Sequence, residues 1–344
     1  MGVETVADGG ESPARRSIWR DGFTPRGFTS VAVAAIVLLG AIVVTGGAVR
    51  LTGSGLGCDD WPNCNESRFV DVSSAHAAIE QLNRLFTFLV GVGVALAAAA
   101  AWLRRPRRRD LRMLGTLIVA GVPAQGLVGA VVVWTDLNPA AVQWHFLLSM
   151  LLVWAAVLLL VRSREPDAPR RRRAVASSTR SLALCVVVTT AITVVLGTIV
   201  TGTGPHAGDE GARRFFGTAT DINGDALRWA SRVHGASVWV TIAVVVALAW
   251  RTRRRADRQR LEGPLTAWMM VAVVQGAVGY TQYFAGLPVG LVIVHLAGAT
   301  ALVGVTAWLW SATSEPDTEQ SALPDAGPGH ASAPAHEAMQ SAQR

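Results

Sequence analysis

The stretches Gln125-Gly126-Leu127-Val128-Gly129 and Gln275-Gly276-Ala277-Val278-Gly279 carry one pattern, repeated 150 residues further along the chain. Each lies in an apolar segment, and each is followed at the same spacing by a histidine, His145 in the first case and His295 in the second. The repetition indicates a duplicated unit with histidines at corresponding depths. Because histidine inside a lipid-spanning segment is costly and usually functional, the two motifs bear on both the fold and the site.

Long apolar runs dominate the composition. The 344 residues are 51% hydrophobic, with a mean hydropathy of +0.37. Runs of about 20 residues, the length needed to cross a bilayer as a helix, recur along the chain. They cover approximately residues 28–49, 76–102, 113–134, 140–161, 181–201, 227–250, 264–284 and 288–310. The sequence therefore predicts an all-α integral membrane protein with eight transmembrane helices.

A second echo, between Thr52-Gly53-Ser54-Gly55 and Thr201-Gly202-Thr203-Gly204, favours two tandem four-helix-bundle repeats. Four helices return the chain to the side on which it started, so the halves are expected to be parallel repeats. The predicted organisation is a cytoplasmic N-terminal segment (1–27), an N-terminal four-helix half (28–162), an Arg-rich cytoplasmic linker (163–180), a C-terminal four-helix half (181–310) and a disordered cytoplasmic tail (311–344).

The distribution of arginine indicates the orientation. All 31 basic residues are arginine, and the net charge is +7. The arginines gather before the first predicted helix and in alternate loops, within residues 15–26, 104–112, 162–180 and 251–260. This positive-inside pattern places both termini of a multi-pass protein in the cytoplasm. A nucleic-acid partner is not expected, because the sequence lacks the aromatic or motif support that such a site needs.

Three histidines are predicted at one level, toward the outer side of the membrane. His145 lies about six residues into its segment, which is roughly 9 Å at the helical rise. His234 and His295 come out at about the same depth, and Asn83 matches His234 in the N-terminal half. Two histidines facing across a bundle can hold a heme iron, whereas zinc would want three or four close ligands. The alternative is that each histidine hydrogen-bonds to a neighbouring helix.

One face of the second predicted helix carries polar residues. His76, Glu80 and Asn83 share it at the spacing i, i+4, i+7, and Arg84 follows. An unpaired carboxylate at this depth is expensive. Glu80 is therefore expected to be protonated, to pair with an arginine, or to serve in chemistry.

Two cysteines enclose an acidic tract in the first outer loop. Cys58 and Cys64 flank Asp59-Asp60-Trp61-Pro62-Asn63. Outer loops face an oxidising compartment, where disulfides persist, so a Cys58–Cys64 disulfide is predicted. The bond is either a structural staple or a labile, redox-active group.

The combination of these features resembles bacterial heme A synthase over about residues 28–310. The resemblance rests on the run Thr52 to Cys64, the segment Ile79-Glu80-Gln81-Leu82-Asn83-Arg84 and the two Gln-Gly-x-Val-Gly motifs. It also rests on His145, His234 and His295, in the fourth, sixth and eighth predicted segments. The resemblance implies an enzyme of the bacterial plasma membrane that oxidises the C8 methyl group of heme O to a formyl group, giving heme A for terminal oxidases. The implied partners are heme O synthase, an electron donor or acceptor, and membrane lipid.

The resemblance also implies roles for individual residues. A heme b cofactor would be held by His234 and His295, and the substrate heme would lie at Glu80 and His145. Apart from the resemblance, the depth of Glu80 favours a neutral carboxyl, so we expect this residue to take up a proton during the oxidation.

The chain departs from the family pattern at Asn83, where many members have histidine. Asparagine is a poor iron ligand, so either His145 holds the substrate heme alone or His76 supplies a second ligand. Asn83 is then expected to orient a water or hydroxyl. Arg84 and Arg232 lie close to the matching positions and are expected to pair with heme propionates, because a guanidinium binds two carboxylate oxygens.

Two other function classes remain open at this point. A non-catalytic heme b electron carrier of the di-heme cytochrome b kind usually stacks two histidines on one helix, whereas the aligned histidines here lie one to a helix. A heme transporter would need discontinuous helices near the midplane, and Pro123 is the candidate kink. Heme content and conversion of heme O separate the three classes.

Overall fold

A computed structural model describes residues 22–168, 170–209, 211–217, 221–253 and 257–318. The predicted N-terminal segment up to residue 21 and the predicted tail from residue 319 lie outside the described residues.

Eight helices in the described part of the chain are long and apolar enough to cross a membrane. They are α2 (Pro25–Leu51), α3 (Ala75–Leu103), α4 (Arg109–Trp134), α5 (Pro139–Ser163), α6 (Ser177–Thr203), α7 (Gly224–Thr252), α8 (Arg258–Phe284) and α9 (Val289–Ser311). Each contains or closely matches one of the predicted segments, so the prediction of an all-α membrane protein with eight spans is confirmed.

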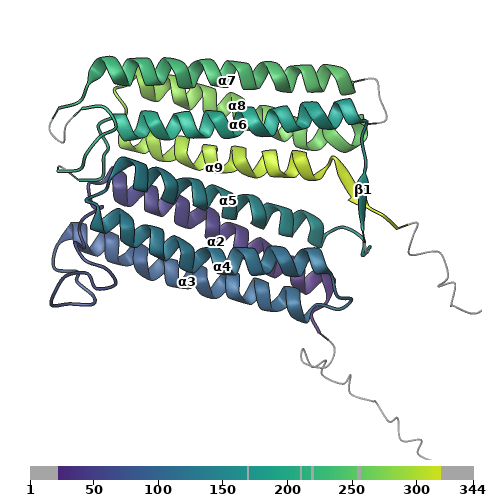
Figure 1. Cartoon of the computed structure of the whole chain (residues 1–344), viewed down its shortest axis with the longest axis horizontal. Coiled ribbons are helices and arrows are strands. Elements are labelled where there is room, and N and C mark those ends of the chain that lie inside the picture. Colours follow the sequence, from purple (N-terminus) through teal and green to yellow (C-terminus); the bar gives the residue numbers. More distant parts are fainter. Residues whose placement is uncertain (1–21, 169, 210, 218–220, 254–256, 319–344) are drawn as a thin grey trace, which may run out of the picture.

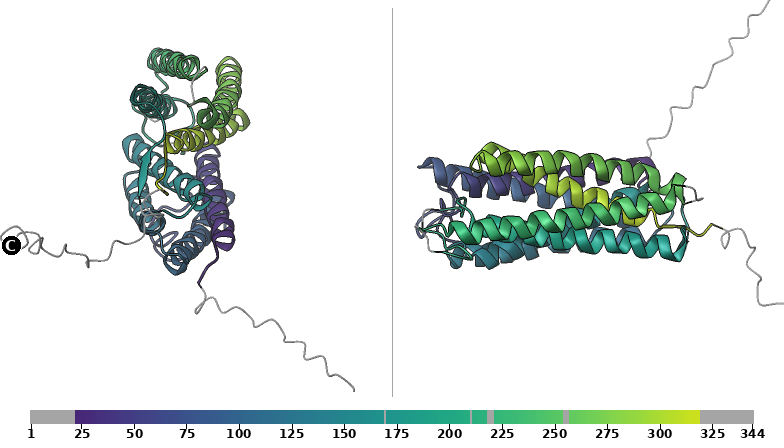
Figure 2. Two further views of the ribbon diagram at one scale, coloured as in Figure 1. Left: turned by 90° about the vertical axis from the view of Figure 1, so that its right-hand side faces the viewer. Right: turned by 90° about the horizontal axis from the view of Figure 1, so that it is seen from above.

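The helices form two bundles that lie side by side with their axes nearly parallel. Figure 1 shows α2 to α5 in one bundle and α6 to α9 in the other. The end-on view in Figure 2 places α5 and α9 at the junction, where they pack against one another. Helix α2 also packs on α9, and α5 on α6. The two helices that carry His145 and His295 therefore lie at the contact between the bundles.

Short polar residues set the starts of several helices. The side chains of Thr24, Ser74, Asn138 and Asn223 accept hydrogen bonds from backbone N–H groups of the first turns of α2, α3, α5 and α7. Such N-caps satisfy donors that a helix cannot pair internally. Pro139 follows its cap, at a position where the missing N–H costs nothing. These caps fix where the four helices begin, and α3, α5 and α7 among them carry His76, His145 and His234.

Each bundle buries one stripe of its helices and exposes the other. In α2 the buried side chains Phe28, Ala32, Ala35 and Leu39 recur every three or four residues, which is one helix face. The opposite faces carry large apolar side chains that are exposed. Phe284, for example, is 79% exposed. A soluble protein rarely exposes apolar surface on this scale, whereas a bilayer covers it.

The two bundles are joined by loops at the end where α2 and α6 finish. The backbone N–H of Gly55 donates to Gly208 O at 2.9 Å, and Arg50 Nε donates to His206 O at 2.8 Å. His206 in turn lies 2.8 Å from Leu287 O through Nε2. The loop after α6 therefore reaches across the N-terminal half, which holds the two halves in one arrangement.

At the other end, the linker and the start of the tail form a small antiparallel ribbon. Strand β1 (Arg171–Arg173) pairs with β2 (Ser314–Pro316), and Arg172 forms an ion pair with Glu315 at 2.9 Å. The prediction of disorder from residue 311 onward is therefore wrong for residues 311–318. The polar composition of this segment suggested disorder, but backbone pairing and the ion pair to the linker order it.

Candidate functional site

The rings of His234 and His295 meet inside the C-terminal bundle. His234 comes from α7 and His295 from α9, and the ring centres are 6.5 Å apart with an angle of 81° between the planes. Two metal–nitrogen bonds of about 2 Å, with about 1.1 Å from each nitrogen to its ring centre, add up to roughly 6 Å. The observed separation therefore fits one metal ion held between two histidine nitrogens.

Hydrogen bonding prepares His234 for such a role. Its Nδ1 lies 3.1 Å from the backbone oxygen of Thr193 on α6. A carbonyl only accepts, so Nδ1 carries the proton and Nε2 keeps its lone pair, the tautomer that a metal requires. In His295 the buried Nδ1 has no hydrogen-bond partner within the described residues. His145 in the N-terminal half has the same unpartnered Nδ1.

Glycines make room for the three rings. A Cβ atom at Gly279 would lie 3.2 Å from His295 Cε1, and one at Gly197 would lie 3.1 Å from His234 Cε1. The Cβ of any larger residue at Gly129 would lie 3.4 Å from His145 Cε1. These distances are at or below ordinary contact, so the last glycine of each repeated motif is a seat for its histidine ring.

The glutamines of the repeated motifs fix the helices that carry the histidines. Gln125 Nε2 donates to the backbone oxygen of His145 at 3.1 Å, and Gln275 Nε2 donates to that of His295 at 3.0 Å. Glutamine and the last glycine of the motif are four residues apart and therefore share a helix face. One turn of helix thus holds the backbone of the histidine and accommodates its ring.

The N-terminal half has asparagine where the C-terminal half has His234. Asn83 Oδ1 accepts a hydrogen bond of 2.8 Å from Thr45 Oγ1. Gly46 is the glycine nearest to Asn83, and Gly46 and Asn83 both precede Gly197 and His234 by 151 residues. The matching glycine contact supports the equivalence drawn from the sequence, so the N-terminal half has an amide at the position that His234 takes in the C-terminal half.

The other polar candidate of α3 lies nearer the outer end. His76 is the second residue of α3, is exposed, and has Nδ1 2.9 Å from Ser54 Oγ. Asn83 is seven residues further along, which is about 10 Å at the helical rise. His76 is thus at the mouth of the N-terminal bundle, whereas Asn83 and the three histidines packed against glycines lie deeper.

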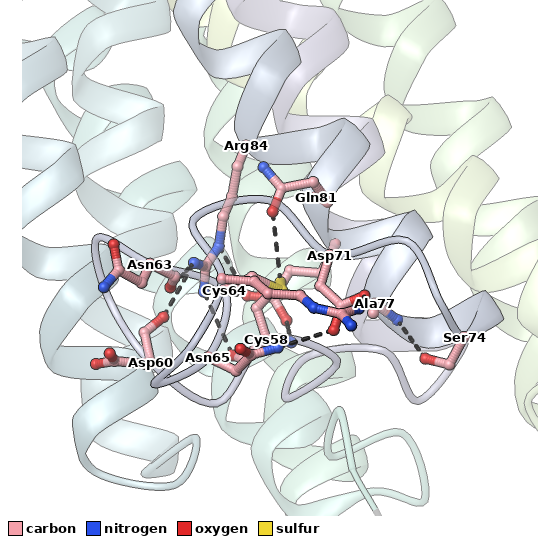
Figure 3. Close-up of a disulfide and its surroundings, with 12 residues drawn as sticks. Cys58, Asp60, Asn63, Cys64, Asn65, Asp71, Ser74, Ala77, Gln81 and Arg84 are labelled. Carbon is pink, nitrogen blue, oxygen red and sulfur yellow. Dashed lines mark hydrogen bonds and ion pairs between the residues drawn. A yellow bond between two sulfur atoms is a disulfide. The ribbon is translucent and has the colours of Figure 1, made fainter.

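The predicted disulfide is present in the loop between α2 and α3. Cys58 and Cys64 are bonded, and both residues are fully buried. Figure 3 shows the bond beneath the loop, beside Gln81 and Arg84 of α3. The Sγ atom of Cys58 lies 3.7 Å from Gln81 Oε1. The disulfide is therefore packed against α3 rather than open to solvent.

Glu80 and Arg84 together clamp this loop to α3. One carboxylate oxygen of Glu80 accepts the backbone N–H of Cys58 at 2.7 Å, and the other pairs with Arg84 Nη2 at 2.7 Å. The arginine also donates to the backbone oxygens of Asp60, Asn63 and Cys58, at 3.0, 2.9 and 3.3 Å. These contacts and Glu80 occupy all five guanidinium N–H groups of Arg84, so a heme propionate could bind this arginine only by displacing some of them.

The remaining predicted residue, Arg232, is exposed on α7 two residues before His234.

A second carboxylate, Asp71, orders the loop between α2 and α3. Asp71 accepts a hydrogen bond of 2.8 Å from Asn65 Nδ2. The pKa of Asp71 is lowered, chiefly because the backbone N–H of Ser73 donates to its carboxylate. These hydrogen bonds favour the ionised form of Asp71, and the ionised carboxylate in turn helps to hold the loop in its folded conformation.

The protein ligands at this site are too few for a bare metal ion, and they suit a metal that is already held by a prosthetic group. Among the described residues, no group of three or more His, Cys, Asp or Glu side chains lies together in a way that could hold a metal ion. Two histidines on opposite sides are the axial set of a heme iron, whose other four positions the porphyrin fills. The residues at His234 and His295 therefore fit a heme.

The chain is similar to known proteins over most of its length. The sequence profile of the cytochrome oxidase assembly protein family matches residues 29–78 and 68–307. This chain belongs to that family. The family match takes in nearly all of the eight helices, the disulfide loop and the three seated histidines.

Individual relatives within the assembly protein family carry a more specific name. A heme A synthase of Rhizorhabdus wittichii is 26% identical over 339 residues, covering 81% of this chain and 92% of that protein. A heme A synthase of Lysinibacillus sphaericus is 35% identical over 130 residues, which is 38% of this chain and 42% of the relative. One from Listeria welshimeri is 33% identical over 139 residues, covering 39% of this chain and 45% of the relative.

Proposed function

We propose that this chain is a heme A synthase, a membrane oxidoreductase that converts heme O into heme A. The observation that carries the proposal is the His234–His295 pair, which meets in one bundle of a protein whose relatives bear that name. The reaction is the oxidation of the C8 methyl group of heme O to a formyl group. The electron-carrier and transporter alternatives are not favoured, since the relatives are named for heme A synthesis.

In the C-terminal half, His234 and His295 would hold the iron of a heme b cofactor. When bound, this heme supplies a one-electron redox centre inside the membrane. The protein contributes the ring positions, through Gly197 and Gly279, and the tautomer of His234, through Thr193 O. Arg232 is the proposed partner of a heme b propionate, since it is exposed on α7 near His234.

In the N-terminal half, His145 is the proposed ligand of the substrate iron. Asn83 lies where the second ring would be, and its Oδ1 already accepts from Thr45. Its Nδ2 group is left to donate to a water or hydroxyl on the substrate side. His76 is placed at the mouth of the bundle and is proposed to act as a gate for the substrate.

Glu80 is proposed to act by holding the disulfide loop over the N-terminal site. Both of its carboxylate oxygens accept hydrogen bonds from the protein, one from Cys58 N–H and the other from Arg84. Proton uptake by Glu80, the role expected from its depth in the membrane, would require this clamp to open. The contacts therefore favour a positioning role for Glu80 and Arg84.

The reaction requires partners. A heme O synthase must supply the substrate, and an electron donor or acceptor must take part, because converting a methyl to a formyl group removes electrons and introduces oxygen. The proposed location is the bacterial plasma membrane, with membrane lipid around the bundles and both termini in the cytoplasm. The gathering of arginines at one end of the bundles supports this orientation.

Expression in a host that makes heme O, followed by acid extraction of the pigments, tests the function. Heme A in the extract of membranes carrying the full chain is the expected result, and its absence with heme O present would overturn the proposal. His145→Ala should abolish heme A while keeping the low-spin heme b spectrum. His234→Ala or His295→Ala should abolish that spectrum, and His76→Ala should leave it intact. A normal spectrum in both C-terminal variants would refute the ligand assignment.

A further inference from the structure

A groove of about 560 Å³ opens between α3 and α4 at the arginine-rich end of the N-terminal bundle. Trp102 of α3 forms one wall, and Arg109, Arg112, Met113 and Leu117 of α4 line the rest. The groove lies at the opposite end of the helices from the histidines and the disulfide loop. None of its residues takes part in the site described above.

The cationic end of the groove carries two arginines without a carboxylate partner. Within the described residues, neither Arg109 nor Arg112 has such a partner, and the Nε atom of Arg112 is buried without a hydrogen bond. Two other arginines of the preceding loop are paired. Arg104 binds Asp167 at 2.9 Å, and Arg108 binds Asp110 at 2.8 Å. Two guanidinium groups therefore face the groove with hydrogen-bonding capacity that the described chain does not use.

The position of Arg112 is nevertheless fixed. Its guanidinium carbon lies 5.0 Å from the centre of the Trp102 ring, a cation–π contact. The indole N–H of Trp102 in turn donates to Thr116 Oγ1 at 3.1 Å. An arginine held on an aromatic face has its position set before any ligand arrives.

The other end of the groove is apolar. Met113 and Leu117 are 63% and 56% exposed, and they lie one to two turns further along α4 than Arg109. At the helical rise, Leu117 is about 12 Å from the level of Arg109. The groove thus presents two cationic side chains at the membrane surface and apolar walls toward the bilayer centre. Trp102 forms one wall of the groove, and tryptophan is enriched at the membrane–water interface.

We propose that this groove binds an anionic phospholipid. Arg109 and Arg112 hold the phosphate, because a guanidinium matches phosphate oxygens with two parallel N–H groups. One acyl chain lies along Met113 and Leu117, where it covers apolar surface. Anionic lipids of the cytoplasmic leaflet are the source of such phosphates at a basic membrane end.

The second half of the chain supplies a matched control. Arg253 lies over Trp250 at 4.8 Å, as Arg112 lies over Trp102, and Arg258 is the first residue of α8 as Arg109 is of α4. Neither Arg253 nor Arg258 lines the groove. The double variant Arg253→Gln/Arg258→Gln therefore removes the same charge from the same end of the molecule and leaves the proposed site whole.

The test is native mass spectrometry of the full-length protein released from nanodiscs of mixed phosphatidylglycerol and phosphatidylcholine. We expect retained phosphatidylglycerol, at least fivefold weaker retention in Arg109→Gln/Arg112→Gln, and unchanged retention in the control double variant. Trp102→Ala should also weaken retention. Equal retention in the groove variant and the wild type would overturn the proposal, as would equal retention of phosphatidylcholine. Low-spin heme b content, measured on the same samples, reports that each variant is folded.

Discussion

Gln143 of α5 donates a hydrogen bond of 2.6 Å from Nε2 to Thr198 Oγ1 of α6, across the junction of the two bundles. Gln143 lies two residues before His145, and Thr198 follows Gly197, the seat of His234. The contact therefore joins the surroundings of the two histidine sites directly. The repeat does not reproduce it, since Ile293 stands 150 residues after Gln143.

Removing this contact should loosen the junction. Thr198→Val keeps the shape of the side chain but deletes the acceptor for Gln143, and interhelical hydrogen bonds in membranes contribute about 0.6 kcal/mol on average. We expect a loss of that order in the free energy of unfolding, measured by titrating detergent-solubilised protein with a denaturing detergent.

Thr189→Val is the matched control for this variant, because the Thr189 hydroxyl bonds to backbone oxygens of its own helix. It should leave the unfolding free energy nearly unchanged. In a double-mutant cycle, Gln143→Leu should add little to Thr198→Val. Additive losses would show that the two side chains act independently.

The glycine seats predict a pair of contrasting variants on α8. Gly279→Ala places a Cβ atom 3.2 Å from His295 Cε1, so the ring must move by a few tenths of an ångström. Gly276→Ala, three residues earlier, meets nothing within 4 Å. We expect the first variant to alter the low-spin heme b spectrum and lower the heme content, and the second to match the wild type. Equal heme spectra in both would contradict the assignment of Gly279 as a seat.

The clamp formed by Glu80 and Arg84 predicts that both residues matter for the same reason. Glu80→Gln and Arg84→Gln should each lower heme A formation and speed reduction of the Cys58–Cys64 bond by a thiol reductant, because the loop is released from α3. Glu66→Gln, at an exposed acid of the same loop, should do neither.

These variants also separate the clamp from proton uptake. If Glu80 takes up a proton during the oxidation, Glu80→Gln should lose heme A formation while Arg84→Gln retains much of it. That pattern, with unchanged disulfide reduction in Glu80→Gln, would disprove the clamp. Heme A extraction and thiol labelling after timed reduction are the two measurements.

The orientation in the membrane can be checked with reporter fusions. Reporters placed after Arg107 and after Asn65 should lie on opposite sides, because α3 separates the two positions and arginine-rich loops stay in the cytoplasm. A fusion after Arg164 should report the same side as the Arg107 fusion. Finding Arg107 and Asn65 on one side would mean that α3 does not cross the membrane.

The helices were predictable because the bilayer imposes their length and composition. The segment predicted to begin near residue 264 starts at Arg258 in α8, since a helix continues beyond the hydrocarbon into the polar interface. The level shared by His234 and His295 was also predictable, because spacing along a helix measures depth directly.

The roles of individual polar side chains were harder to predict. The spacing of Glu80 and Arg84 signals an ion pair on one helix face. No sequence pattern reveals that Arg84 also binds three backbone oxygens of a loop more than 20 residues away. The repeated motif marked Gln125, Gln275 and the glycines that follow them as a pattern. The sequence did not show that these glutamines bond to the histidine backbones or that the glycines contact the rings, because both depend on how neighbouring helices face one another.

The ribbon of β1 and β2 has a consequence for the biosynthesis of the chain. Strand β1 precedes the whole C-terminal half, whereas β2 follows its last helix. Strand β1 therefore leaves the ribosome long before β2 has been synthesised. Arg172 can form its ion pair with Glu315 only after the whole of α9 has been made. A chain that ends before residue 314 contains all eight spans yet lacks this final fastening between the linker and the end of α9.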